Sequence, residues 1–376
     1  MPLSRIDPDR YSALFAAKAE RLRRDFAALD PPEPQRFASP PLGYRLRAEF
    51  RMWHADGRID YAMFDPANPR RVLTIEDFPP AAQPIRTLMP MLRERLMADE
   101  TLSRRLFQTE FLATLKGETL ASLIYHRPLD ADWEAAAQAL AADLGIPLIG
   151  RSRGQKIVIG RDWLEEEIIV DGMRLRYRQI EGGFTQPNGA INRAMLGWAR
   201  AQAANLGGGD LLELYCGNGN FTVALAPFFD KVLATESNKS SVAAARHNLE
   251  ANGVRNVALA RLASDEVGAA LAGTRPFRRL ADIDLGAFRF STLFVDPPRA
   301  GLDTATRALA RGFDNILYLS CNPATLRANV AMLPEHRLAA AAVFDQFPYT
   351  DHLECGLLLQ KRRARPPSPP LAPAPQ

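Results

Sequence analysis

The chain of 376 residues contains few cysteines and few histidines. Its three cysteines, Cys216, Cys321 and Cys355, cannot form a four-thiolate cluster, and their spacing is not that of a disulfide framework. The five histidines show no zinc-ligand spacing. We therefore expect neither a metal ion nor an iron–sulfur cluster.

Long apolar runs are also lacking, since no stretch is long enough to span a bilayer. Residues 6–10, Ile-Asp-Pro-Asp-Arg, do not have the character of a signal peptide. We therefore expect a cytoplasmic protein with no membrane partner, and no obligate protein partner is evident. The net charge of +4 permits a nucleic-acid partner without requiring one.

What is present indicates an ordinary globular protein of two domains, with 47% apolar and 24% charged residues. Residues 1–178 are predicted to form an N-terminal helix and an α+β domain. Helices are expected at 11–29, 84–97 and 133–144, and hairpins at 44–53 with 58–64 and at 107–115 with 119–125.

The strand at 44–53 alternates cleanly between apolar and charged residues. Arg45, Arg47 and Arg51 fall on the face opposite the apolar set. This face is either a platform for RNA phosphates or an ordinary solvated face, and the stretch by itself favours neither. The basic loop 151–156 is likewise either a phosphate contact or a polar turn.

Residues 179–362 alternate between strands and helices, which predicts a doubly wound, Rossmann-like parallel sheet and hence an α/β fold. Strands are expected at 211–215, 232–235, 257–262, 292–295, 316–319, 340–344 and 356–359, and helices at 188–204, 221–229, 240–252 and 304–310. Residues 363–376 are rich in proline and are predicted to be a disordered tail.

A glycine-rich loop follows the first of these strands. Gly217 and Gly219 would let the backbone approach a nucleotide, and Glu236 ends the next strand about 20 residues on, as a ribose-binding acid does. Thr222 stands where dinucleotide-binding proteins place a third glycine. This favours S-adenosylmethionine over NAD, because no pyrophosphate then needs a cradle.

Cys321 comes where a buried strand ends and a helix begins at Pro323. Ligands bind at this edge of an open α/β sheet, and a helix N-terminus is expected to lower the pKa of the thiol. Taken alone, a free cysteine is more often a small buried hydrophobe.

Two acids complete the pattern. Asp296 precedes two prolines at a strand end, so it either reaches a ligand or lies on a stiff, exposed loop. Glu354 precedes the last apolar strand and is either a base or an ion-paired carboxylate. A thiolate and a carboxylate beside a methyl donor suggest addition to a pyrimidine: sulfur attacks C6, C5 takes the methyl group, and a base removes the C5 proton.

At these residues the chain resembles the tRNA (uracil-5-)-methyltransferases, which form ribothymidine at position 54 of the tRNA T-loop. The resemblance covers residues 11–359, and its specific parts are 44–51, 184–188, 212–221, 294–299, 320–323 and 344–356. It implies that Cys321 is the nucleophile and Glu354 the proton acceptor, with RNA bound largely by the N-terminal domain. It also implies that S-adenosylmethionine is bound by Gln186, Tyr215, Asn220, Glu236 and Asp296.

Other functions remain as alternatives. The nearest is a ribosomal-RNA uracil-C5 methyltransferase, although the sister enzymes usually carry a cysteine-ligated iron–sulfur cluster. A cytosine-C5 enzyme would need a second cysteine near Asp296. An NAD-dependent oxidoreductase or a non-catalytic RNA-binding or chaperone protein would leave Cys321 and Glu354 unexplained. RNAs other than tRNA that carry a T-loop-like fold are possible further substrates.

Overall fold

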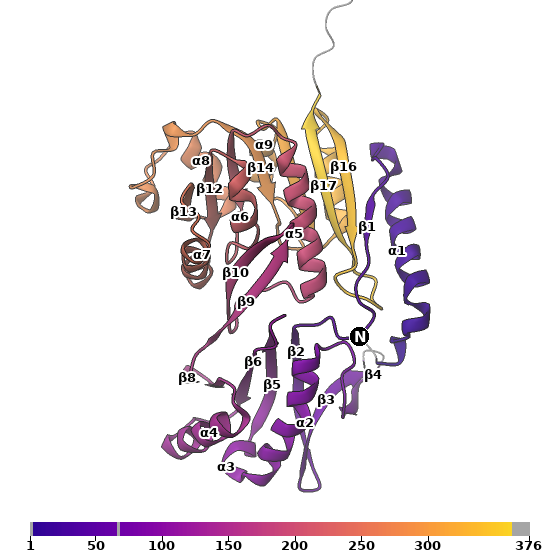
Figure 1. Cartoon of the computed structure of the whole chain (residues 1–376), viewed down its shortest axis with the longest axis vertical. Coiled ribbons are helices and arrows are strands. Elements are labelled where there is room, and N and C mark those ends of the chain that lie inside the picture. Colours follow the sequence, from indigo (N-terminus) through magenta and orange to yellow (C-terminus); the bar gives the residue numbers. More distant parts are fainter. Residues whose placement is uncertain (1–2, 66–67, 363–376) are drawn as a thin grey trace, which may run out of the picture.

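The computed structural model describes residues 3–65 and 68–362, so the expected proline-rich tail lies outside the described residues. Figure 1 shows two lobes, each built around its own β-sheet. The smaller lobe holds a seven-stranded sheet and the larger one an eight-stranded sheet, with a separate two-stranded ribbon beside the larger sheet.

The smaller lobe is an α+β unit, as predicted, with the strand order β4-β3-β2-β5-β6-β7-β8. Phe50, Tyr61 and Phe111 form an aromatic cluster in its core, and the hydroxyl of Tyr61 donates a hydrogen bond to the carbonyl of Met89 in the covering helix. The elements are β2 Arg47–Ala55, β3 Arg58–Asp65, β4 Asn68–Ile75, α2 Gln83–Ala98, α3 Glu100–Ser103, β5 Leu106–Ala113, β6 Thr119–Tyr125, α4 Ala131–Leu144, β7 Leu148–Ser152 and β8 Gln155–Ile159.

Both predicted hairpins of this lobe are confirmed, since β2 pairs with β3 and β5 pairs with β6. Helix α4 ends at Gly145, whose positive φ of 65° closes the last turn. Strands β4, β7 and β8 were not predicted. β7 and β8 have only five residues each, and β4 begins with Asn68, Pro69 and two arginines, so the apolar pattern of each strand is short.

The larger sheet has the order β1-β16-β17-β15-β14-β11-β12-β13. Five strands run parallel from β15 to β13, and β17 is antiparallel to both of its neighbours. The strands are β1 Gln35–Phe37, β11 Asp210–Leu214, β12 Lys231–Glu236, β13 Val257–Arg261, β14 Phe290–Val295, β15 Asn315–Ser320, β16 His336–Phe344 and β17 Glu354–Lys361. The predicted Rossmann-like sheet is thereby confirmed, with its chain order reversing between β11 and β14.

Helices cover both faces of this sheet, because each face contributes to its own apolar core. One face packs against α5, α6 and the β9–β10 ribbon, and the other against α1, α8 and α10. The bounds are α1 Tyr11–Phe26, β9 Trp163–Val170, β10 Met173–Ile180, α5 Gly189–Ala204, α6 Asn220–Leu225, α7 Lys239–Ala251, α8 Ser264–Leu271, α9 Thr304–Ala310 and α10 Pro323–Ala331.

The N-terminal segment packs with the larger lobe. Tyr11, Phe15 and Phe26 of α1 share a core with the sheet, and β1 pairs in parallel with β16 (Figure 1). Ribbon β9–β10 also packs there. The division into 1–178 and 179–362 therefore differs from the packing units, and it stays a proposal about which part of the chain performs which role.

Candidate active site

The predicted site residues gather at one edge of the larger sheet. Tyr215, Asp296 and Cys321 directly follow the parallel strands β11, β14 and β15, and Glu236 ends β12. Glu354 reaches the same edge from the opposite direction, because it is the first residue of the antiparallel β17. This edge, beside the reversal between β11 and β14, is where open α/β sheets bind ligands.

Strand register brings Cys321 and Glu354 together. Ser320 pairs with Cys355 across β15 and β17, so one further residue along that register sets Cys321 opposite Glu354. Residues opposite each other in an antiparallel pair have Cβ atoms about 5 Å apart. A thiol and a carboxylate can therefore act on two adjacent atoms of one flat ring.

The pKa of the Cys321 thiol differs from the prediction. Asn322 caps α10 by accepting hydrogen bonds from Ala324 N and Thr325 N, as the helix start predicted. Burial, with the negative charges of Glu354 and Asp296, nevertheless raises the pKa of Cys321 to about 11. The prediction of a lowered pKa was wrong, because burial and these carboxylates outweigh the opposing influence of Arg299 and of a backbone hydrogen bond at Cys321.

Burial raises the pKa of two carboxyl groups at this edge, Glu354 and Asp296. Glu354 is buried, with 5% of its surface exposed, and burial raises its pKa well above the ordinary range, with the charge of Asp296 adding to the effect. Burial also raises the pKa of Asp296 to about 7. A carboxyl group whose pKa lies near 7, as that of Asp296 does, can take up or release a proton near neutral pH, which suits proton transfer.

The glycine-rich loop is strained and tightly held. Tyr215 takes a left-handed backbone with φ of 60°, and Gly217 and Gly219 follow with φ of 57° and 80°. Glu236 braces the loop, since one carboxylate oxygen accepts from Gly217 N at 3.1 Å and the other from Asn238 N at 2.8 Å. Non-glycine strain of this kind clusters at ligand sites.

Two amide pairs fix the remaining predicted residues. Asn220 exchanges two hydrogen bonds with Asn192 of α5, at 2.9 and 3.1 Å. Gln186 accepts from Gln346 Nε2 at 2.5 Å and donates to Asp296 at 3.5 Å. Sequence reasoning assigned no role to Asn192 or Gln346, and the available signal was a polar residue among apolar neighbours.

Glu213 is another residue to which the sequence assigned no role. It lies in β11, is 1% exposed, and has one carboxylate oxygen without a hydrogen-bond partner among the described residues. Burial raises its pKa to about 8. A charged residue within an apolar strand was the signal that could have drawn attention to it.

The residues around the glycine-rich loop fit S-adenosylmethionine. This ligand carries positive charge on its sulfonium and amino groups, and Glu236, which holds the loop, and Asp296, directly after β14, supply negative charge nearby. A Cβ at Gly217 would meet no atom within 4 Å, so the loop leaves open space on that side. A pyrophosphate would be repelled by the same acids, and Thr222 is fully buried where a third glycine would have to lie. The loop therefore suits S-adenosylmethionine better than NAD.

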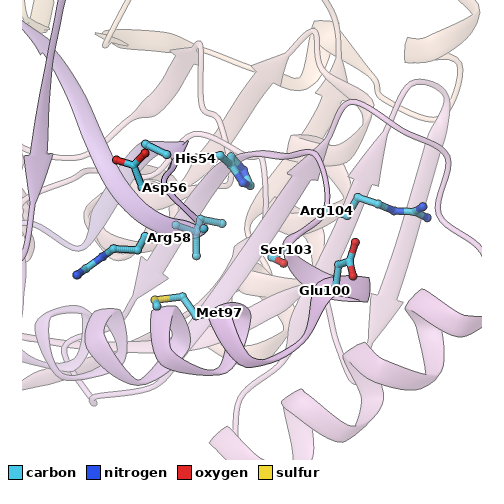
Figure 2. Close-up of a pocket in the computed structure, with 10 residues that line it drawn as sticks. His54, Asp56, Arg58, Met97, Glu100, Ser103 and Arg104 are labelled. Carbon is cyan, nitrogen blue, oxygen red and sulfur yellow. The ribbon is translucent and has the colours of Figure 1, made fainter.

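The smaller lobe carries two adjoining hollows that share His54. One, of about 380 Å³, lies between the β2–β3 turn and α2–α3, and Figure 2 shows Arg58, Glu100 and Arg104 around it. The other, of about 290 Å³, is lined by Arg105, Phe107 and His126 among others. The Phe107 and His126 rings stack with centroids 3.8 Å apart.

The predicted arginine face is partly used within the protein. Arg45 Nε donates to the carbonyl of Arg47 at 2.7 Å, and Arg47 donates to the carbonyl of Gly183. The guanidinium of Arg51 lies 3.7 Å from the centroid of the Phe107 ring. The alternation is as predicted, but this face is not a fully solvated cationic surface.

Comparisons with known proteins identify the family. The sequence pattern of the family described as tRNA (Uracil-5-)-methyltransferase matches residues 10–362. The chain belongs to this family. A relative from Azoarcus sp. (strain BH72), named tRNA/tmRNA (uracil-C(5))-methyltransferase, is 64% identical over 365 residues, covering 97% of this chain and 100% of the relative. One of the same name from Dechloromonas aromatica (strain RCB) is 60% identical over 363 residues, or 96% and 100% of the two chains.

This chain shares its fold with a protein of solved structure. It is the Pyrococcus abyssi tRNA (uracil-54, C5)-methyltransferase in complex with S-adenosyl-L-homocysteine. The TM-score is 0.71, the sequence identity is 20%, and the match covers 93% of this chain and 83% of that chain. At this identity the likeness supports the fold alone.

Family membership gives the class of reaction. The enzyme is an S-adenosylmethionine-dependent tRNA uracil-C5 methyltransferase. Within residues 3–65 and 68–362, no three His, Cys, Asp or Glu side chains gather into a possible metal site. The absence of metal stays a prediction, to be tested by elemental analysis. Of the helices described, none combines the length and apolar character needed to cross a bilayer.

Proposed function

We propose that this chain methylates carbon 5 of uridine 54 in the T-loop of tRNA, with Cys321 as nucleophile and Glu354 as base. The observation that carries the proposal is the register of β15 and β17, which sets this thiol against this carboxylate at the sheet edge where Asp296 also lies. When bound, S-adenosylmethionine supplies a methyl group on a positively charged sulfur.

The residues then act in order. The Cys321 sulfur bonds to uracil C6 as a thiolate, a form that the positive charge of Arg299 favours. Electron density moves to C5, which takes the methyl group. Glu354 removes the C5 proton, the electrons of that C–H bond re-form the C5–C6 double bond, and the sulfur leaves as a thiolate. The base that reacts must first leave the RNA stack.

Gln186, Tyr215, Asn220, Glu236 and Asp296 are proposed to hold the methyl donor. The amide pairs orient two of these side chains before any ligand arrives, because Asn192 fixes Asn220 and Gln346 fixes Gln186. Preformed hydrogen bonds of this kind lower the entropy lost on binding.

The smaller lobe is proposed to bind the RNA. Its hollows combine exposed cations with the stacked rings of Phe107 and His126, and flat rings beside cations suit unpaired bases and phosphates. Phe184, 71% exposed, lies between this lobe and Gln186 in the sequence and is a further candidate for stacking.

The substrate range follows from the names of similar proteins. The Azoarcus relative is named for tRNA and tmRNA, and the Pyrococcus protein for uracil 54. We propose tRNA as the main substrate and other RNAs with a T-loop-like fold, including tmRNA, as further substrates. A cytoplasmic location belongs to the same proposal.

The deciding experiment incubates unmodified tRNA with isotope-labelled S-adenosylmethionine and maps the label by mass spectrometry of RNA fragments. Label at C5 of position 54 is expected. Label at another position, or unlabelled tRNA together with label in ribosomal RNA incubated in parallel, would overturn the proposal. Cys321→Ala should abolish transfer, whereas the matched thiol variant Cys216→Ala should retain activity.

Glu354→Gln separates the two halves of the reaction. The variant keeps the shape of the side chain but lacks the base, so a covalent, already methylated protein–RNA adduct should persist in denaturing gels. Adding Cys321→Ala should eliminate this adduct. Release of methylated tRNA at the wild-type rate would exclude Glu354 as the base.

A further inference from the structure

A buried ion pair joins the N-terminal helix to the far end of the chain. Lys18 Nζ of α1 lies 2.7 Å from Asp345 Oδ1, directly after β16, and the two residues are 8% and 0% exposed. Buried ion pairs contribute little net stability compared with apolar residues of similar size, although removing one partner alone is strongly destabilising. The Lys18–Asp345 pair therefore suggests a role other than stability.

The ammonium group of Lys18 donates its other hydrogen bonds to the same loop. It donates to the carbonyl of Phe347 at 3.0 Å and to that of His352 at 3.2 Å. Lys18 thus ties together both ends of residues 345–353. This loop ends at Glu354, only two residues beyond His352.

Other contacts of the loop also come from the N-terminal segment. Asp345 N donates to the carbonyl of Phe37 at 3.0 Å, and the Tyr349 hydroxyl donates to that of Pro41 at 2.9 Å. On the exposed side, Arg21 Nη2 donates to the carbonyl of Asp351 at 2.8 Å. Residues near the start of the chain therefore set the backbone path that delivers Glu354.

We propose that Lys18 is a positioning residue for the proton-removal step: through the loop 345–353 it holds Glu354 where it can reach C5 of the uracil. The inference rests on the proposed function of Glu354. It predicts a defect in the second half of the reaction, because Lys18 bonds the loop next to Glu354 and not the strand end that carries Cys321.

The test compares Lys18→Met with the double variant Lys18→Met/Asp345→Asn. The single variant leaves a buried carboxylate without its cation and should melt at a lower temperature. The double variant removes that charge and should regain much of the lost melting temperature, yet it still lacks the three bonds to the loop. Arg23→Met is the matched control, because Arg23 lies on the same helix in an exposed pair with Glu20.

Each protein is assayed at a temperature at which circular dichroism shows it folded. The double variant should turn over on the order of 10- to 100-fold more slowly and accumulate the protein–RNA adduct, as expected for a misplaced base. Amides of residues 345–353 should exchange hydrogen faster in both Lys18 variants. Arg23→Met should match the wild type in every readout.

A double variant that turns over at the wild-type rate without adduct, or whose loop exchanges as slowly as the wild type, would overturn the proposal. If the Lys18 variants do not fold, Arg21→Met tests the loop from its exposed side, and unchanged exchange and adduct levels there would also count against it. If Glu354→Gln forms no adduct, Glu354 is not the base. Hydrogen exchange of residues 345–353 in the Lys18 variants then still shows whether Lys18 holds the loop.

Discussion

The residues proposed to react, Cys321 and Glu354, have pKa values that burial has raised above their ordinary range. Burial and neighbouring acids raise the pKa of Cys321 to about 11, so little thiolate exists near neutral pH in the free protein. The site therefore favours a nucleophile that becomes reactive when positive charge arrives, since a cation near sulfur lowers the pKa.

This raised pKa can be measured by alkylation. In protein without RNA or methyl donor, the rate of Cys321 modification by iodoacetamide should rise about tenfold per pH unit from pH 7 and level off only near pH 11. Peptide mass spectrometry follows Cys321 separately from the buried Cys216 and Cys355. A rate that levels off near pH 8.5 would show an ordinary thiol instead.

The buried acid Glu213 should make stability depend on pH. Its pKa is about 8 in the folded chain, against 4.5 for an ordinary glutamate. Between these values the folded chain binds more protons than the unfolded chain, so the free energy of unfolding falls as pH rises from about 4.5 to about 8, by an amount on the order of a few kcal/mol.

Glu213→Gln removes this contribution. Urea unfolding of the wild type and the variant from pH 5 to pH 9 should show the variant gaining stability relative to the wild type as pH rises. Other buried acids act equally on both proteins, so the difference between the two curves reports Glu213. Parallel curves would mean that the Glu213 pKa is not raised.

Among the secondary-structure elements, the junction of α3 and β5 presents the cations best placed for RNA. Arg104 and Arg105 form no ion pair with any described residue, and Arg105 lies in the hollow that contains Phe107. By contrast, Arg95 of the neighbouring α2 is paired with Asp143 at 2.7 Å.

Arg105→Gln should therefore weaken tRNA binding and leave S-adenosylmethionine binding unchanged. If Arg105 contacts a phosphate, the slope of log affinity against log salt concentration should fall by about one, measured by filter binding at several salt concentrations. Arg95→Gln is the control and should change neither the affinity for tRNA nor its salt dependence. An unchanged slope in Arg105→Gln would remove this element from the RNA surface.

At the scale of the whole molecule, the larger lobe is built from two separate parts of the chain, one before and one after the smaller lobe. Helix α1 and β1 complete its sheet and core before the chain enters the smaller lobe, whose core is built almost entirely from residues 46–159. The two lobes therefore differ in whether a continuous piece of sequence contains the whole core.

Fragments should reflect this difference. A fragment of residues 43–160 should melt cooperatively alone, whereas a fragment of residues 161–362 should not. The second fragment lacks Tyr11, Phe15, Leu22 and Phe26, each worth about 1.5–3 kcal/mol when buried. Co-expression with residues 1–42 should restore its cooperative melting, followed by circular dichroism. Cooperative melting of 161–362 alone would show that α1 is dispensable.

Features that depend on local pattern could be predicted from the sequence alone. Alternation fixed the hairpins of the smaller lobe, strand–helix alternation fixed the parallel sheet, and Asn322-Pro323 fixed the start of α10. Because the carboxyl ends of parallel strands meet at one edge, the convergence of Cys321 with Asp296 and Glu236 also followed from order along the chain.

Contacts between residues far apart in the sequence, and the pKa values that they set, could be known only from the folded structure. The pKa of Cys321 rises because the fold buries its thiol and because Glu354 and Asp296 lie near it, and no local pattern reports either effect. Lys18 meets Asp345 across 327 positions of sequence, and Asn192 meets Asn220 only once α5 has docked on the sheet. Local propensity acts over a few residues, whereas electrostatics and burial depend on which surfaces fold against each other.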